Sequence, residues 1–178
     1  MLGAISVVLG FTPLGFIPIG LANVTTMHIP VIIGAIVEGP FVGAMVGLIF
    51  GISSLIKSFM TPTPISFIFM NPLVSVVPRV LIGILTYYFY TAMKKVVRNE
   101  KTVILMSGAF GTLVNTVLVL GTAYLLYAQR IVEAMSLPEG GAFAFFMGIA
   151  TTNGVPEMIV AAVVTAASVT AIKKIVKN

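Results

Sequence analysis

Long apolar segments with almost no charge constrain this chain more than any other feature of its sequence. Leu73–Met93, for example, is a run of 21 residues in which Arg79 is the only charged side chain. A helix that crosses the hydrocarbon core of a bilayer needs about 20 mainly apolar residues. Only 8% of the whole chain is charged, whereas about a quarter of a soluble domain is charged. We therefore expect an integral membrane protein.

Six apolar segments are candidates for membrane helices, and together they predict one all-α transmembrane domain over residues 1–178. In order they are Met1–Phe11, Thr26–Val37, Pro40–Phe59, Met70–Met93, Thr102–Tyr127 and Thr152–Val176. The second is too short to cross a bilayer comfortably at about 1.5 Å per residue, so it tilts, is shielded by neighbours or extends backward. Five helices are the alternative to six.

Basic residues cluster at two places and thereby predict the orientation of the bundle. One cluster lies between the fourth and fifth segments and the other follows the sixth; they comprise Lys94, Lys95, Arg98 and Lys101, and Lys173, Lys174 and Lys177. With six helices both clusters share a side with the amino terminus, and the positive-inside rule makes that side cytoplasmic. We therefore expect both termini in the cytoplasm, and no nucleic-acid partner for the net charge of +5.

Two of the three loops on the outer side are apolar and uncharged. These are Thr12–Thr25 and Thr61–Asn71, which either form a lid over a cavity or lie in the interfacial layer of the membrane. The third loop, Ala128–Gly141, contains acidic and basic residues and is typical of a solvated connector.

Small residues predict close helix packing. The third segment has a glycine at every fourth position, namely Gly39, Gly43, Gly47 and Gly51. In a helix this spacing makes one face without side chains, where another backbone approaches closely. The partner is either a neighbouring helix of the same bundle or a separate membrane subunit.

Three predicted helices begin at the outer side, each with a polar residue ahead of a proline: His28 before Pro30, Asn71 before Pro72, and Asn153 before Pro156. Such signals are typical of helix starts, whose free N–H groups favour an anion. Arg79 lies about two turns below Asn71 and adds a full charge. An ionisable group in an apolar helix normally faces a partner or a wet cavity, and the natural match for an arginine is a carboxylate.

The acid that matches Arg79 is either Glu157 or a ligand. Glu157, just inside the sixth segment, is a structural counter-ion of Arg79 or an acceptor for ligand hydroxyl groups. Asn115 and Asn153 supply amides, which both donate and accept hydrogen bonds. His28 and Asn71 are either further ligand contacts or residues that only complete a helix end.

Several functions are disfavoured by what the sequence lacks. The chain has no cysteine and one histidine, so we expect neither a thiolate nor a multi-histidine metal site. No phosphate-cradling loop or hydrolase motif is present, so we expect no enzyme and no cofactor bound by this chain. A ligand-free structural membrane protein and an intramembrane enzyme remain the alternatives from other classes.

The chain resembles the substrate-binding S components of energy-coupling factor (ECF) vitamin transporters, and most of all those for pantothenate. The similar segments are PLGFIPIG, MHIPVIIGAIVEGPFVGAMVGLIFGISSLI, NPLVSVVPRVLIGI, NTVLVLG and TNGVPE. The resemblance implies a bacterial multi-pass membrane protein with a vitamin cavity near the outer surface. It also implies a membrane T component and two cytoplasmic ATPase subunits as partners, with ATP used by those subunits.

The resemblance also assigns roles to residues of this chain. It places Asn71, Arg79, Asn115, Asn153 and Glu157 near the cavity. The small-residue surface that the family uses against the T component is reduced here to Gly3 and Ala4, so the glycines of the third segment are candidate contributors. Pantothenate has one carboxylate, two hydroxyls and an amide, which suits this set. The alternative ligands are a hydroxymethylpyrimidine, riboflavin or folate.

Overall fold

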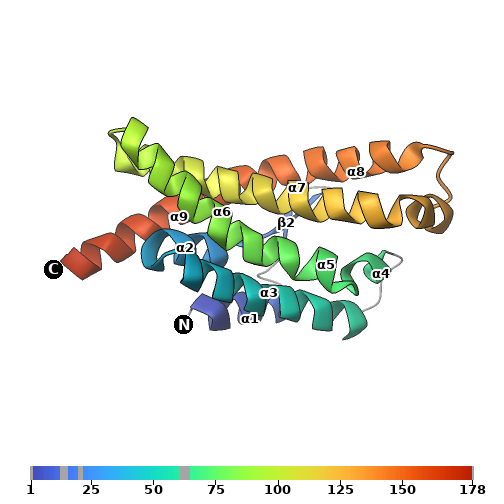
Figure 1. Cartoon of the computed structure of the whole chain (residues 1–178), viewed down its shortest axis with the longest axis horizontal. Helices are drawn as coiled ribbons and strands as arrows, with labels where there is room; N and C mark the ends of the chain where they lie inside the picture. Colours follow the sequence, from blue (N-terminus) through green and yellow to red (C-terminus); the bar gives the residue numbers. More distant parts are fainter. Residues whose placement is uncertain (1, 13–15, 20–21, 61–64, 178) are drawn as a thin grey trace.

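The computed structural model describes residues 2–12, 16–19, 22–60 and 65–177. Helices dominate these residues (Figure 1). The elements are α1 (Leu2–Phe11), β1 (Phe16–Ile19), β2 (Ala22–Thr25), α2 (Ile29–Glu38), α3 (Pro40–Met60), α4 (Ser66–Phe69), α5 (Pro72–Ser75), α6 (Val77–Val96), α7 (Glu100–Ala134), α8 (Gly141–Thr152) and α9 (Gly154–Lys177). The predicted helical membrane bundle is confirmed at this level.

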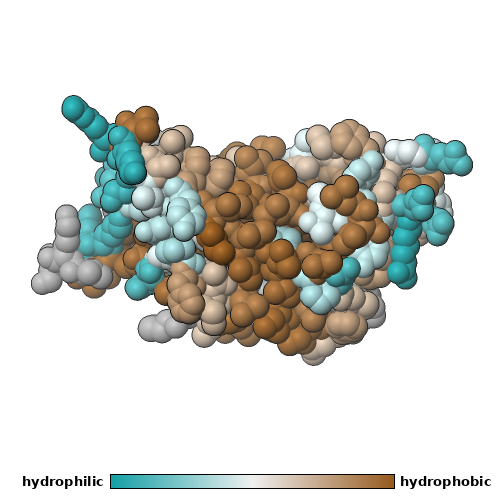
Figure 2. All heavy atoms as spheres, viewed as in Figure 1, coloured by the Kyte–Doolittle hydropathy of each residue, from teal (hydrophilic) through white to brown (hydrophobic). Residues whose placement is uncertain are grey.

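Four stretches of the described residues are long and apolar enough to cross a membrane. They are Pro40–Met60, Pro72–Val96, Glu100–Ala134 and Gly141–Ile175, and they cover most of the third to sixth predicted segments. The described parts of α1 and α2 have ten residues each, or about 15 Å, which is half the thickness of the hydrocarbon core. Figure 2 shows one face of the bundle, with apolar residues across its middle and hydrophilic residues toward both ends.

The short helix α2 lies in the centre of the molecule. All eight residues from Ile29 to Ile36 are buried. α2 packs against α1, α3, α6, α7 and α9, so its backbone and apolar side chains face protein on every side. A helix that is enclosed in this way does not have to match the bilayer thickness. Of the three alternatives for the short second segment, the structure therefore shows the one in which neighbouring helices shield it from lipid.

The glycine face of α3 is filled by α2, α5 and α6 of the same chain. A Cβ atom on Gly47 would lie 2.2 Å from the carbonyl oxygen of Arg79, and one on Gly51 would lie 2.8 Å from the carbonyl oxygen of Ser75. A Cβ atom on Gly43 would lie 2.7 Å from the Cβ atom of Ala35 in α2 and 3.1 Å from the Cα atom of Gly83 in α6. The nearest neighbours of these three glycines therefore belong to the same chain, as in the internal-packing alternative. Gly39, with φ 99°, instead forms the turn between α2 and α3.

A short antiparallel hairpin occupies part of the first apolar outer loop. β1 and β2 pair with Phe16 opposite Thr25 and Ile19 opposite Ala22. The pairing satisfies backbone N–H and C=O groups that would otherwise need water, which suits a loop with apolar side chains. The remaining loop residues, 13–15, 20–21 and 61–64, lie outside the described part of the chain. The sequence analysis did not predict the strands.

The predicted connector Ala128–Gly141 is mostly helical. α7 continues to Ala134, because Arg130 and Glu133 are compatible with a helix that extends into water. α8 begins at Gly141, well before the predicted start of the sixth segment. α8 and α9 then form one candidate span, interrupted only at Asn153.

Candidate functional site

Arg79 is buried near the start of α6, where 6% of its surface is exposed. Its Nη1 donates to the carbonyl oxygen of Val74. The guanidinium carbon lies 5.4 Å from the ring centre of Phe50 and 5.9 Å from that of Phe69. Both rings offer π-faces to the cation, yet Nε has no hydrogen-bond partner. A buried donor without a partner is costly, so this nitrogen is a candidate ligand contact.

Glu157 does not neutralise Arg79. No carboxylate within the described residues lies within 4 Å of the Arg79 guanidinium. Glu157 Oε1 instead accepts two hydrogen bonds of 2.8 Å from Thr25, one from its backbone N–H and one from its hydroxyl. The carboxylate thereby fastens the end of β2 to the first turn of α9. The structural ion pair, one of the two alternatives from the sequence, is absent.

His28 bonds to α7 and keeps one ring nitrogen unpaired. It is 1% exposed, and its Nε2 lies 2.9 Å from Thr112 Oγ1. The Thr112 hydroxyl already donates to the carbonyl oxygen of Gly108, so in this network it accepts the proton of His28 Nε2. The neutral ring then presents Nδ1 as an acceptor, and Nδ1 is buried without a partner.

Asn115 lies on the same face of α7 as Thr112, because residues three apart in a helix are neighbours. Its Oδ1 is also buried and unpartnered. Thr112 was missed by the sequence analysis, as was the role of Thr25. The three-residue spacing from Asn115 was the available signal for Thr112.

Asn71 and Asn153 have local bonding partners. Asn71 Oδ1 caps α5 by accepting from the N–H of Leu73 at 2.9 Å, and its Nδ2 donates to Tyr127 at 3.0 Å. Asn153 stands between α8 and α9, where its Oδ1 accepts from Thr152 at 3.4 Å. The predicted helix starts at Asn71 and Asn153 are therefore present. The amino terminus of α9, however, follows α8 directly.

The amino end of α2 brings these groups together. His28, just before α2, bonds to Thr112 of α7, and Thr25 bonds to Glu157 of α9. α2 also packs against α6, which carries Arg79. One unpaired cationic donor and two unpaired acceptors thus come from α6, from α7 and from the residue before α2, three elements that pack against one another. Such a set can bind a small molecule with an acid at one place and hydroxyl or N–H groups at others.

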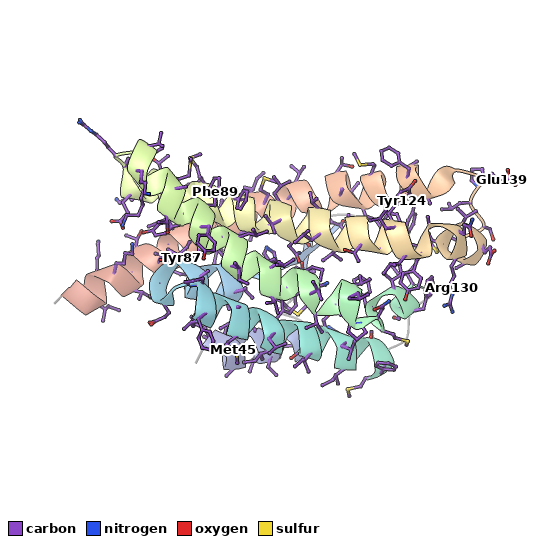
Figure 3. All side chains as sticks on the ribbon, in the orientation of Figure 1. Met45, Tyr87, Phe89, Tyr124, Arg130 and Glu139 are labelled. Atoms are coloured by element: carbon purple, nitrogen blue, oxygen red, sulfur yellow. The ribbon has the colours of Figure 1, made fainter. Side chains whose placement is uncertain are left out.

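Gly3 and Ala4 lie in a separate groove at the outside of the bundle. It has a volume of about 530 Å³ and is also lined by Glu38, Phe41 and Met45. Phe41 is 77% exposed. Figure 3 shows Met45 on the outer side of α3. A Cβ atom on Gly3 would meet Ile49 at 2.6 Å, so Gly3 also allows α1 to approach α3.

Comparisons with known proteins cover most of the chain. The family model described as "ECF transporter, substrate-specific component" matches residues 1–169. The pantothenic acid transporter PanT of Lactococcus lactis subsp. cremoris is 33% identical over 168 residues, covering 86% of this chain and 80% of that protein. The pantothenate transporter PanT of Leuconostoc mesenteroides subsp. mesenteroides is 30% identical over 165 residues, covering 89% and 79%.

Proposed function

The chain belongs to the family of substrate-specific components of ECF transporters, and from this we propose that it captures pantothenate for an ATP-driven importer. The family consists of transporter components rather than enzymes, and the four apolar spans make this a multi-pass protein of the bacterial membrane. The names of the two relatives support pantothenate over a hydroxymethylpyrimidine, riboflavin or folate.

The buried guanidinium of Arg79 is the observation that carries the proposal. It has no carboxylate within 4 Å among the described residues, and its Nε–H has no acceptor. A charge buried in a membrane span is costly unless something compensates it. In the proposed complex the pantothenate carboxylate accepts from Nε–H and neutralises the charge. This role is the ligand-binding alternative that the sequence analysis left open.

The rest of pantothenate offers hydroxyl and amide N–H donors. In the proposed complex these donate to His28 Nδ1 and Asn115 Oδ1, two buried acceptors that lack partners. Asn153 contributes its amide at the break between α8 and α9. Glu157 acts through its bonds to Thr25, which hold the hairpin next to α9, and its second oxygen is a further acceptor for a ligand hydroxyl. Asn71 caps α5, the short helix whose Val74 carbonyl oxygen accepts a hydrogen bond from Arg79.

Transport in this proposal requires a membrane T component and two cytoplasmic ATPase subunits, which use the ATP. The chain adopts six membrane helices with both termini in the cytoplasm and holds its ligand near the outer face. Gly3, Ala4 and the groove that they line provide the docking surface for the T component, and Gly39 follows Glu38, another residue of that lining. The filled glycine face of α3 has an internal role instead.

The proposal is tested by measuring pantothenate and pantothenol affinities by calorimetry on the purified protein. Pantothenol has a hydroxyl in place of the carboxylate. We expect wild type to bind pantothenate much more tightly, and Arg79→Ala to lose at least about thirtyfold in pantothenate affinity while pantothenol affinity changes little. Arg130→Ala is the matched control, since Arg130 is exposed at the far end of the bundle (Figure 3).

Two results would contradict parts of this proposal. Equal affinity of the wild type for pantothenate and pantothenol would mean that no cationic group of the protein binds the pantothenate carboxylate. An unchanged pantothenate affinity in Arg79→Ala would remove Arg79 as its receptor. Mass spectrometry of small molecules that co-purify with the protein identifies the ligand independently, and a different vitamin there would replace pantothenate. Co-purification with ATPase subunits separates the transporter from a ligand-free structural protein.

A further inference from the structure

A groove runs between α7 and α9 at the end of the bundle where the basic residues cluster. Its volume is about 550 Å³. Lys101 and Lys174 line it together with the hydroxyl of Thr102, while Leu105, Ala167 and Ala171 form apolar walls. The groove is remote from the proposed vitamin site, because Lys101 precedes Asn115 by 14 residues, or about 21 Å along α7.

The two lysines carry charge that the chain does not neutralise. Glu100, the nearby acid, is already bound by Lys173 at 2.5 Å and lies 4.0 Å from Lys94. Within the described residues neither Lys101 nor Lys174 has an ion-pair partner, and both are exposed. The groove therefore presents two uncompensated cations side by side with a hydroxyl group.

The apolar walls lie inside membrane-spanning stretches. Leu105 is in the span of α7, and Ala167 is in the span of α8 and α9. Leu105 is 45% exposed, and the alanines opposite it leave space that a longer side chain would fill. The groove thus combines a cationic end, near the ends of two candidate membrane spans, with an apolar trough that continues along them.

From this combination we propose that the groove binds an anionic phospholipid. Its phosphate lies between Lys101 and Lys174, and one acyl chain lies along Leu105, Ala167 and Ala171. A soluble anion would use only the lysines and leave the apolar trough unexplained. An acidic protein segment would have to enter the hydrocarbon region to contact these walls. Basic pockets between membrane helices are known to recognise anionic headgroups.

The test is native mass spectrometry of the detergent-purified chain with equimolar phosphatidylglycerol and phosphatidylcholine of identical acyl chains. We expect wild type to retain phosphatidylglycerol preferentially. The double variant Lys101→Gln/Lys174→Gln should lose on the order of thirtyfold in apparent affinity for it, about fivefold per lysine. The control Lys95→Gln/Arg98→Gln removes the same charge from exposed residues at the same end that do not line the groove, and should stay within about twofold.

A second variant tests the apolar part. Ala167→Phe fills the trough without changing the charge, and it should weaken phosphatidylglycerol retention while thermal unfolding shows an intact fold. The proposal is overturned if wild type retains both lipids equally, or if both double variants lose retention equally. It is also overturned if Ala167→Phe retains the lipid fully while soluble glycerol phosphate competes for the lysines, because the groove would then be a site for soluble anions.

Discussion

The contact between Gly47 of α3 and the backbone of α6 is the tightest glycine contact described in the molecule, and Gly47→Ala tests it. The added Cβ atom would lie 2.2 Å from the carbonyl oxygen of Arg79 and 2.8 Å from the carbonyl carbon. Ordinary contact begins at about 3.4 Å, so the two helix backbones must separate by about 1.2 Å. Backbone atoms cannot rotate away as a flexible side chain does, and the whole interface between α3 and α6 must adjust.

Overpacking of this kind costs typically about 1–3 kcal/mol, and contact with backbone on both sides places Gly47→Ala at the upper end. For a chain of this size about 3 kcal/mol corresponds to a fall in Tm of about 6–12 °C. The assay is thermal unfolding of the detergent-purified protein. Gly121→Ala is the matched control, because Gly121 is also within a helix but its Cβ would meet nothing within 4 Å.

We expect Gly121→Ala to leave Tm unchanged or to raise it slightly, since alanine favours a helix more than glycine does. Pantothenate affinity should fall in Gly47→Ala, because α6 carries Arg79 on the displaced turn. The reasoning would be refuted if Gly47→Ala unfolds at the temperature of the wild type, or if Gly121→Ala is equally harmful. In either case the close approach of α3 to α6 would not be what the glycine is needed for.

Three further predictions concern polar contacts. Thr25→Val removes one of the two hydrogen-bond donors to Glu157. Amide hydrogen exchange at β2 should therefore become faster, and pantothenate affinity should fall about tenfold. Unchanged exchange would show that this hydrogen bond does not hold the hairpin in place. Thr112→Val leaves His28 Nε2 without a hydrogen-bond partner and should lower Tm by about 2–10 °C. The control Thr122→Val should have little effect on Tm, because Thr122 loses only a hydrogen bond within its own helix. Lys173→Gln breaks a half-exposed ion pair with Glu100, and because exposed ion pairs contribute at most about 1 kcal/mol, Tm should fall by less than about 4 °C. A larger fall would contradict this expectation.

The polar residues of the candidate site could be named from the sequence, but their bonding partners could not. Arg79, Glu157 and Asn115 were recognisable because polar groups in apolar spans are costly and therefore informative. Sequence distance gave no sign that Thr25 would take up the Glu157 carboxylate, since the two residues are 132 positions apart. That contact bears on whether the acid that matches Arg79 is Glu157 or a ligand, because Glu157 Oε1 bonds to Thr25 instead of to Arg79.

Helix ends show the same division. The predicted end of the fifth segment at Tyr127 marks where the apolar composition stops, but α7 continues to Ala134. Composition reports where the lipid ends, whereas a helix ends where its backbone hydrogen bonding ends. The strands β1 and β2 were missed for a related reason, because pairing between two short segments depends on their approach in space.

Composition and the spacing of charge by themselves determined that this chain is a helical membrane protein, because about 20 apolar residues are suited to little else than crossing a bilayer. The spacing of the glycines predicted a face for close packing from Gly39 to Gly51, which holds at Gly43, Gly47 and Gly51, whereas Gly39 forms the turn before α3. The fold had to be seen to learn that α2, α5 and α6 fill that face, that α2 is enclosed, and that no acid among the described residues lies within 4 Å of the Arg79 guanidinium. The physical reason is that solvent preference is a property of each segment, whereas a contact is a property of two segments brought together by the fold.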